Sequence, residues 1–400
     1  MTPRLAAALA LGALLVGAPA QASDWSGDLT LEATGFLADP LDPRQADAAW
    51  SVAFEPEWFH DWNDGADRVQ LTAFARWDSV DDERSHLDLR ELYWRHSFES
   101  AELRVGVRKV FWGVAESQHL VDVINQTDGV ENLDGEDKLG QPMLDLALLR
   151  GWGTTELFVM PLFRERTFAA AAGRPRFQPR VDADQPLYES GSADRHVDYA
   201  ARWSHTLGAW DIGVAWFGGT ARDPLFVPAL DGAEAVLAPV YLQARQWSLD
   251  LQSTQGAWLW KLEWLTRDWT PGRYTAATVG FERTLYGVFA DDNGSKDLGL
   301  IVEYLFDDRP PLERVTPFED DLFLGARLAW NDAQSTELLA GAIVGLAGDG
   351  VFASVEWSRR LGASFKLALE GRAFLDTRPG DFLHPLRDDD YLRLELGWYF

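Results

Sequence analysis

The sequence contains no cysteine among its 400 residues. This absence excludes disulfide bonds, catalysis by a thiolate and metal sites with cysteine ligands. The fold must therefore be stabilised without covalent cross-links. A closed barrel, in which every strand is hydrogen-bonded to two neighbours, is one source of such stability.

Long hydrophobic runs are also missing. After residue 22 the chain has no stretch of about 18 apolar residues, which excludes membrane-spanning helices. The mean hydropathy of −0.20 is also reached by membrane β-barrels, because their lipid-facing and lumen-facing residues alternate. Aromatic residues make up 12% of the chain and include 19 tryptophans. This abundance fits the two aromatic girdles that such barrels place at the membrane interfaces.

Positive charge is scarce. Lys and Arg total 36 against 63 Asp and Glu, so the net charge is −27. A nucleic acid partner is therefore not expected, because a phosphate-binding surface needs a basic excess. Much of the acidity lies in segments expected to be loops or strand ends (78–84, 128–137 and 388–390). Surface solvation explains most of it.

The N-terminus carries an export signal. Arg4 supplies a positive charge, Leu5 to Val16 form an apolar run too short to cross a bilayer, and Ala20-Gln21-Ala22 is a small-x-small cleavage pattern. We expect residues 1–22 to be a signal peptide and the mature chain to start near Ser23.

Apolar residues occupy every second position of the last ten residues. Leu392, Leu394, Leu396, Trp398 and Phe400 share one face of the last ten residues, and polar or small residues share most of the other. An amphipathic edge strand of a soluble sheet has the same pattern, but the export signal at the other end favours a membrane barrel. The segment resembles the terminal strand of bacterial outer-membrane barrels. That resemblance implies that Trp398 and Phe400 form an assembly signal for the barrel-assembly machinery.

The same alternation runs through residues 23–400 without a composition break. We therefore predict an all-β protein with one domain, a transmembrane antiparallel β-barrel of about 18 strands, with 16 as the nearest even alternative. The expected strands are 24–37, 48–62, 67–78, 86–98, 100–112, 142–152, 154–165, 195–207, 209–221, 240–252, 256–269, 275–288, 297–306, 320–331, 334–347, 350–361, 363–376 and 388–400.

The connections between these strands alternate in length. The even-numbered ones up to the tenth are tight, and two of the odd-numbered ones are long, 113–141 and 166–194. Outer-membrane barrels have short periplasmic turns and longer extracellular loops, so both chain ends are expected in the periplasm. Two connections depart from this rule: the turn near 290–296 is long and the one at 347–350 is short.

No motif for catalysis or cofactor binding is present. The seven histidines lie in no sequence of the type Gly-x-Ser-x-Gly or His-Glu-x-x-His, and the chain has no Walker A loop and no dinucleotide fingerprint. Asp291 to Asp297 begins like a calcium loop but lacks the closing Glu, so a polar turn is the better interpretation. We expect no enzymatic activity, no cofactor and no metal.

The polar face of the predicted strands carries charges of both signs. Buried charges need partners, so some pairs are expected, such as Arg393 with Glu370, and a water-filled lumen accommodates the rest. A barrel plugged by its own salt bridges is the alternative, but 16 to 18 strands favour an open lumen. The inward basic residues are Arg76, Arg104, Arg108, Arg202, Lys261, Arg327, Lys366, Arg372 and Arg393, and the acidic ones are Glu55, Glu57, Asp198, Glu263, Glu282, Glu303, Glu356, Glu370 and Glu395.

Three segments carry a further resemblance. They are Arg104 to Gly113 with its Arg-x-Gly strand and Trp-Gly pair, Asp122-Val123-Ile124-Asn125, and Thr316 to Leu328 followed by Asn331-Asp332. The sequence is similar in these segments to a poorly characterised group of proteobacterial outer-membrane proteins. The resemblance implies a porin-like barrel and nothing about its cargo.

The expected function is a porin-like channel for passive diffusion of small solutes across the bacterial outer membrane. The alternative is a barrel that serves an export system or handles lipid or another hydrophobic ligand. The expected partners are outer-membrane lipid, the barrel-assembly machinery and small solutes.

The expected constriction is residues 113–141, the third extracellular loop, which is long enough to fold back into the lumen. Its acidic residues would face basic residues of the neighbouring strands and create a transverse field. In the alternative, the loop is a solvated cap and the arginines pair with lumen carboxylates. The loop residues proposed for the constriction are Glu116, Asp122, Asp128 and Glu131, and those on the wall are Arg76, Arg104 and Arg108.

Overall fold

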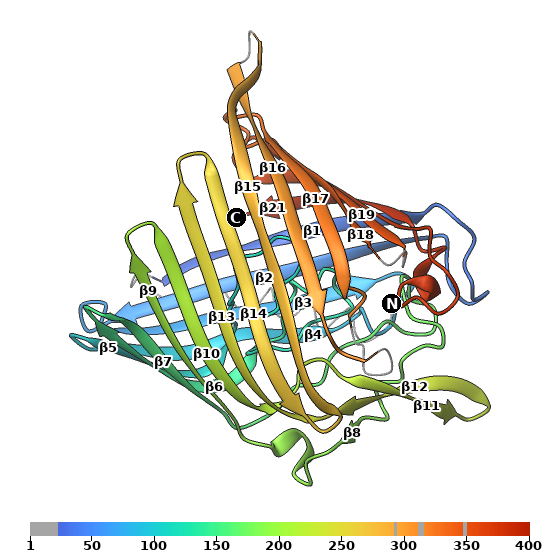
Figure 1. Cartoon of the computed structure of the whole chain (residues 1–400), viewed down its shortest axis with the longest axis horizontal. Coiled ribbons are helices and arrows are strands. Elements are labelled where there is room, and N and C mark those ends of the chain that lie inside the picture. Colours follow the sequence, from blue (N-terminus) through green and yellow to red (C-terminus); the bar gives the residue numbers. More distant parts are fainter. Residues whose placement is uncertain (1–22, 292–293, 311–315, 347–349) are drawn as a thin grey trace.

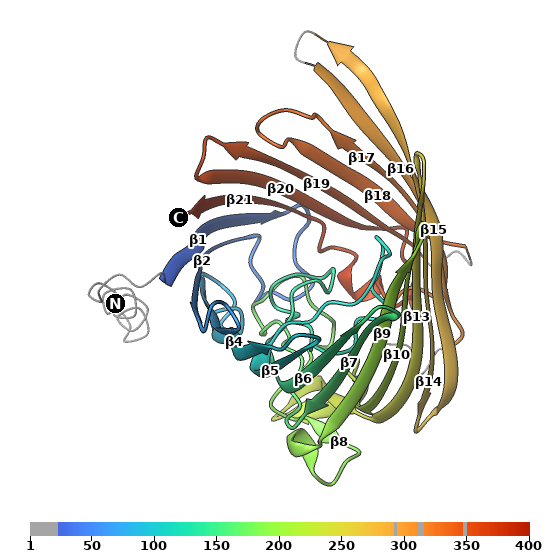
Figure 2. The ribbon, with the colours of Figure 1, turned by 90° about the vertical axis from the view of Figure 1, so that its left-hand side faces the viewer.

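The computed structural model describes residues 23–291, 294–310, 316–346 and 350–400, so the expected signal peptide lies outside the described residues. Eighteen strands form one antiparallel sheet. The sheet closes into a barrel because β1 (Ser23–Phe36) pairs with β2 (Ala48–Trp62) on one side and with β21 (Tyr391–Tyr399) on the other (Figures 1 and 2). The structure confirms the all-β, 18-stranded barrel and excludes the 16-stranded alternative.

Each predicted strand corresponds to one barrel strand, with ends that differ by a few residues. The other strands of the barrel are β3 (Asp67–Asp78), β4 (Leu87–Ser97), β5 (Ala101–Arg108), β6 (Gln141–Arg150), β7 (Gly153–Met160), β9 (Asp198–Leu207), β10 (Trp210–Thr220), β13 (Gln243–Gln255), β14 (Trp258–Trp269), β15 (Gly272–Asp291), β16 (Gly294–Asp307), β17 (Asp320–Ala329), β18 (Glu337–Gly345), β19 (Val351–Leu361) and β20 (Phe365–Leu375).

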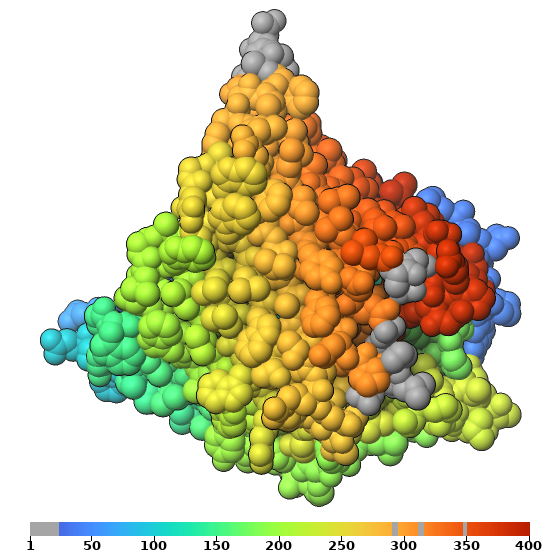
Figure 3. Space-filling model, in the orientation of Figure 1, coloured from blue at the N-terminus to red at the C-terminus, as the bar shows by residue number. Residues whose placement is uncertain are grey.

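Alternation along the strands separates an apolar outside from a charged inside. On β14, Trp260 is 43% exposed, whereas Lys261 and Glu263 are buried. Trp258 packs against Phe281 of β15, with ring centroids 5.2 Å apart, and both lie near the end of the barrel that carries the short turns. Figure 3 shows a continuous outer surface over β13 to β17. An apolar band with interfacial aromatic residues is the surface that a lipid bilayer requires.

Most short turns lie at one end of the barrel and the long loops at the other, as predicted, but the tight turn between β14 and β15 lies at the loop end. The long turn expected near 290–296 belongs to a hairpin of β15 and β16 that projects beyond its neighbours (Figures 1 and 3). Pairing of β14 with β15 ends at Arg283, and pairing of β17 with β16 ends at Asp297. Residues 285–291 and 294–296 therefore extend past the adjacent strands at the short-turn end. Residues 347–349 of the other exception lie outside the described residues.

A second, three-stranded sheet was not predicted. β11 (Leu225–Asp231) and β12 (Glu234–Tyr241) form an antiparallel hairpin, and β8 (Leu187–Tyr188) runs parallel to β12. The segment was expected to be loop up to residue 240, where the next barrel strand was placed. Tyr241 instead ends β12, fully buried against Phe163, with ring centroids 4.9 Å apart, so β13 starts three residues later than expected.

The structure describes two short 3-10 helices, η1 (Ala193–Arg195) and η3 (His384–Leu386), both at the end of the barrel with the long loops. In the described part of the chain, no helix is long and apolar enough to cross a bilayer.

Candidate functional site

Residues 109–140, which we name the lumen loop, fold into the barrel and cross its interior (Figure 2). The loop leaves β5 and reaches β14 on the other side of the lumen. There Val114 N and Ala115 N donate hydrogen bonds to Glu263 Oε1, at 2.6 and 2.9 Å, and Val121 N donates to Glu263 Oε2 at 3.3 Å. The backbone of the loop is therefore fastened to the barrel wall.

A second carboxylate holds the next residues of the lumen loop. Glu303 of β16 accepts hydrogen bonds from Glu116 N at 2.9 Å, Ser117 N at 2.8 Å and Ser117 Oγ at 2.6 Å. Glu263 and Glu303 are both 0% exposed. A buried carboxylate is costly unless hydrogen bonds satisfy it, and here main-chain N–H groups supply most of them. We call Glu263 and Glu303 the latch carboxylates.

Side chains of the lumen loop add ion pairs to the same side of the barrel. Glu116 pairs with Arg327 of β17 at 2.7 Å and with Lys261 of β14 at 3.5 Å. Asp134 pairs with Arg372 of β20 at 3.4 Å. The loop therefore contacts four strands, β14, β16, β17 and β20, that lie across the lumen from its origin.

The near side of the lumen holds the loop through a charge network. Arg76 of β3 pairs with Glu131 of the loop at 2.7 Å and with Glu32 of β1 at 3.1 Å. Glu32 also contacts Arg84 at 2.7 Å and Arg393 at 3.6 Å. Arg393 in turn lies opposite Glu370 on the neighbouring strand, 3.6 Å away, which confirms the predicted pair.

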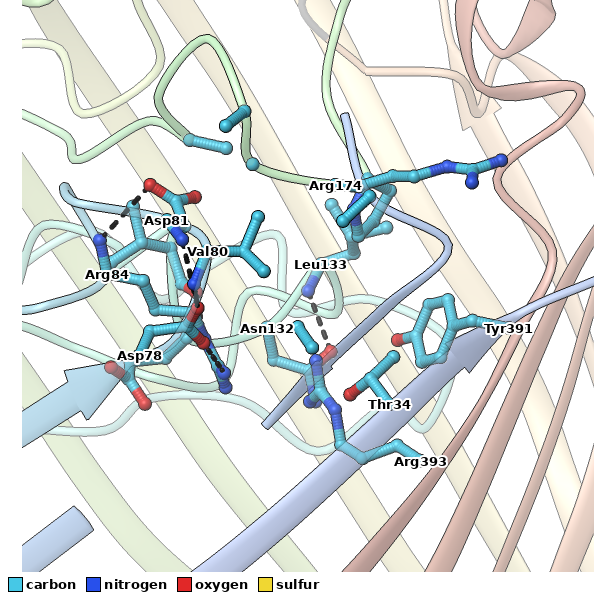
Figure 4. A pocket seen from close by; sticks show the side chains of 18 of the residues that line it. Thr34, Asp78, Val80, Asp81, Arg84, Asn132, Leu133, Arg174, Tyr391 and Arg393 are labelled. Carbon is cyan, nitrogen blue, oxygen red and sulfur yellow. Dashed lines mark hydrogen bonds and ion pairs between the residues drawn. The ribbon is translucent and has the colours of Figure 1, made fainter. Parts of the chain in front are cut away.

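A small pocket lies beside this network. Figure 4 shows Asp78 and Arg84 on one side of it and Tyr391 and Arg393 on the other, with Asn132 of the lumen loop between them. Its volume of about 40 Å³ is enough for a few water molecules. The pocket is too small to pass a solute.

Asp128 is the most buried acidic residue of the loop. Its carboxylate is 2.7 Å from Arg90, 3.4 Å from His86 Nε2, and accepts a hydrogen bond from Thr167 Oγ1 at 2.6 Å. Asp122, by contrast, pairs within the loop, with Lys138 at 3.2 Å. Three of the four predicted acidic residues, Asp122 being the exception, therefore contact basic residues outside the loop.

Arg104 and Arg108 are placed differently from Arg76. Arg104 lies 2.9 Å from Asp145 of β6 and also contacts Glu102, and Arg108 contacts the same Asp145. Neither forms an ion pair with the lumen loop among the described residues. Of the three predicted wall arginines, Arg76 faces the loop, and the other two pair with carboxylates of the wall.

Two of the three segments that carry the sequence resemblance contribute to the lumen loop, and the third lies on and beside β17. Gly113 has a φ of +146°, which favours glycine, and a Cβ there would crowd Glu263 Oε1 at 3.0 Å. Trp112 is buried against Phe158. Asn125 accepts a hydrogen bond from Val110 N. It also donates to the carbonyl oxygens of Arg108 and Leu139, which ties the two ends of the loop together.

A larger cavity of about 370 Å³ remains between the lumen loop and the barrel wall. Part of this wall is apolar, where the alternation predicted polar residues on the inside. The expectation was wrong here because β18, the first half of β17, the start of β19 and the end of β20 are apolar on both faces, so a period of two does not separate inside from outside there. We call these residues the apolar wall: Phe318, Phe323, Leu339, Ile343, Phe352 and Phe374.

Two clusters of three possible metal ligands occur among the described residues. One comprises His86, Asp128 and Glu131, and the other Asp134, Glu356 and Glu370. Arginines are paired with the carboxylates of both clusters. Arg90 and Arg76 pair with those of the first, and Arg372 pairs with those of the second. These guanidinium groups already neutralise the carboxylates.

No protein-family model and no curated sequence matches this chain. Solved structures do. OccK3 (OpdO) of Pseudomonas aeruginosa has a TM-score of 0.53 at 11% identity, with 94% of this chain and 96% of that chain covered. A BenF-like porin from Pseudomonas fluorescens Pf-5 has a TM-score of 0.52 at 12% identity, with 94% of this chain and 98% of that chain covered. OccK8 (OprE) of Pseudomonas aeruginosa has a TM-score of 0.52 at 12% identity, with 95% of this chain and 98% of that chain covered.

The chain has the fold of an outer-membrane porin barrel. At these identities the likeness concerns the fold alone. Together with the apolar outer band, this fold places the protein in a bacterial outer membrane.

Trp398 and Phe400 lie on the outside of the barrel, where both are nearly half exposed. Their ring centroids are 5.3 Å apart, and Phe400 also stacks on Phe54 of β2 at 6.2 Å. Phe400 N donates to Gly27 O, so the last residue joins the seam between β21 and β1. The role of these two residues as an assembly signal remains a prediction.

Docking of the lumen loop is expected to weaken as the pH rises above neutrality. Burial lowers the pKa of His86, but its hydrogen bond and charge interactions with Asp128 and Glu131 raise that pKa more, so the net shift is upward. A raised pKa means that His86 stabilises the folded state fully below its unfolded pKa of about 6.5. That stabilisation is lost as the pH rises through the folded value.

The measurement is the free energy of unfolding in urea as a function of pH. His86→Gln should remove this part of the pH dependence. His205→Gln is the control, because His205 forms no ion pair among the described residues. Identical pH profiles for His86→Gln and the unmodified protein would contradict the role of His86.

Proposed function

We propose that the mature protein, residues 23–400, is a porin-like channel for passive diffusion of small solutes across the outer membrane. The observation that carries the proposal is the lumen loop, which is held inside a closed barrel by both walls and leaves a cavity of about 370 Å³ beside it. A loop that narrows the lumen without filling it restricts passage by size and charge.

A second candidate is a barrel that handles a hydrophobic ligand. The apolar wall favours it, because a general aqueous pore does not need phenylalanine side chains on its inner face. Planar lipid bilayers separate the two. A diffusion channel gives steady ohmic current after insertion of the purified, folded protein, whereas a ligand-handling barrel without an open path gives none.

We further propose that the constriction lies where Glu116, Asp128 and Glu131 of the lumen loop meet the basic residues around them. In a narrow lumen these opposed charges act strongly on a passing ion. Arg104 and Arg108, which pair with Asp145, then contribute to selectivity only through the charge of the wall below the loop.

The double variant Arg104→Glu with Arg108→Glu tests that contribution. It places two more carboxylates beside Asp145, so the reversal potential in a salt gradient should shift toward cation preference if the pathway runs along β5. Heat-modifiable migration on a gel reports whether the variant is folded. An unchanged reversal potential in a folded variant would remove β5 from the permeation pathway.

A further inference from the structure

Four arginines gather at one end of the cavity beside the lumen loop. We call Arg166, Arg222, Arg267 and Arg309 the arginine cluster; all four line the cavity. They come from the loop after β7, the loop after β10, β14 and the segment after β16. Asp223 lies among them. Burial raises the pKa of Asp223, but the charges of Arg267, Arg309 and Arg166 lower it by more, so the net shift of the pKa is downward.

Three of the four guanidinium groups in this cluster form ion pairs with carboxylates. Arg222 pairs with Asp198 at 2.8 Å, and Arg267 pairs with Asp223 at 3.2 Å. Arg309 pairs with Asp307 at 2.6 Å. Arg166 forms no ion pair among the described residues. Within the described part of the chain, four cations therefore face three carboxylates, and the excess positive charge is that of Arg166.

Polar atoms without hydrogen-bond partners around the cavity are mainly donors. They include Arg166 Nε, Arg309 Nη1, and both Nε and Nη1 of Arg372 at the opposite wall, all buried. An unpaired buried donor costs free energy, so these N–H groups need acceptor atoms from water or from a ligand. Carboxylates of the lumen loop supply no acceptor atom to Arg166, since Glu116 is already paired with Arg327 and Glu136 with His119.

The apolar wall faces the same cavity. Phe323, Ile343, Phe352 and Phe374 project inward from four successive strands, β17 to β20. Phe352 and Phe374 pack together with ring centroids 5.5 Å apart. A fully hydroxylated solute such as a sugar gains little from this surface, whereas an aromatic ring or short alkyl chain is removed from water on it.

We propose that the cavity is a binding site for small amphipathic organic anions, with the anionic group on Arg166 and the apolar body on the apolar wall. The proposal rests on the proposed function, since it names the class of solute that the channel takes. Donors at one end and hydrocarbon along the side exclude an inorganic cation and disfavour a neutral polar solute.

The test is isothermal titration calorimetry of the detergent-solubilised barrel. The probe is 3-phenylpropanoate, which carries a carboxylate and a ring. Its amide, 3-phenylpropanamide, keeps the shape without the charge, and acetate keeps the charge without the ring. We expect 3-phenylpropanoate to bind at least about tenfold more tightly than either.

Two variants locate the site. Arg166→Gln should weaken binding of 3-phenylpropanoate about tenfold and leave binding of the amide unchanged, and Phe318→Ala should weaken both. Phe318 lies in the segment before β17, so its removal leaves the barrel strands intact. The control is Arg195→Gln, which makes the same change at an exposed position of the same loop as Arg166. Equal binding of the acid and its amide, no binding of 3-phenylpropanoate, or full binding by Arg166→Gln would overturn the proposal.

Conductance separates this proposal from the proposed function. Ohmic current from a barrel that does not bind 3-phenylpropanoate would support the diffusion channel and overturn the anion site. Binding that depends on Arg166 in a barrel without current would support the site and overturn passive diffusion.

Discussion

Replacement of both latch carboxylates by glutamine, Glu263→Gln with Glu303→Gln, is expected to raise the single-channel conductance severalfold. In the native barrel these two carboxylates accept the hydrogen bonds from residues 114–121 that hold the lumen loop across the pore. Hydrogen bonds to a charged acceptor contribute about 1.5–3 kcal/mol each. Glutamine keeps one acceptor oxygen but presents an NH₂ group in place of the other.

The substitution removes particular hydrogen bonds between the latch carboxylates and the lumen loop. Glu263 uses one oxygen for Val114 N and Ala115 N and the other for Val121 N, so no rotamer of glutamine satisfies all three. Glu303 uses one oxygen for both Ser117 N and Ser117 Oγ. The loop should therefore loosen from β14 and β16, where the ion pairs of Glu116 with Lys261 and Arg327 remain, and the lumen widens on the far side.

Current through single barrels in planar bilayers measures this effect. The matched control is Glu55→Gln with Glu57→Gln on β2, which removes two lumen charges that accept no hydrogen bond from the lumen loop among the described residues. A rise in conductance confined to the latch variant supports a restrictive loop. Equal conductance of the latch variant and the unmodified barrel would show that the loop does not limit flow.

Leu394→Arg is expected to destabilise the barrel by about 2–4 kcal/mol, because the substitution places a cation on the lipid face near the bilayer midplane. Leu394 is 49% exposed and lies in the middle of β21, paired with Ala33 on one side and Leu369 on the other. No lumen carboxylate is within reach of an outward side chain at this position, so the cost is not offset.

Glu395→Gln is the control for the lipid-face substitution. Glu395 is the next residue on the same strand, points into the lumen and lies opposite Glu32 of β1. Loss of its charge should cost little or nothing, since it removes a like-charge contact. A urea titration of refolding into lipid vesicles compares the two variants. Similar destabilisation by both would mean that the inward and outward faces of β21 have been assigned wrongly.

Much of this protein follows from its sequence alone. A period of two along β21 and β14 places Leu394 and Trp260 outside and Arg393 and Glu263 inside, because successive side chains of a strand point to opposite faces. Closure, strand number and the alternation of short turns with long loops follow from the same local pattern. The pair of Arg393 and Glu370 followed as well, because β20 and β21 are adjacent antiparallel strands and both residues lie on the inward face.

Only the tertiary structure decided what fills the lumen. Contacts of Glu263 with Val114 and of Glu303 with Ser117 join residues more than 140 positions apart, and no local pattern specifies them. The inward Phe323 and Ile343 were hidden because β18 and the first half of β17 are apolar on both faces. Arg76 and Arg104 are equivalent in the sequence, as inward arginines on nearby strands. The path of the lumen loop brings Glu131 to Arg76, whereas Arg104 pairs with Asp145 on the adjacent strand.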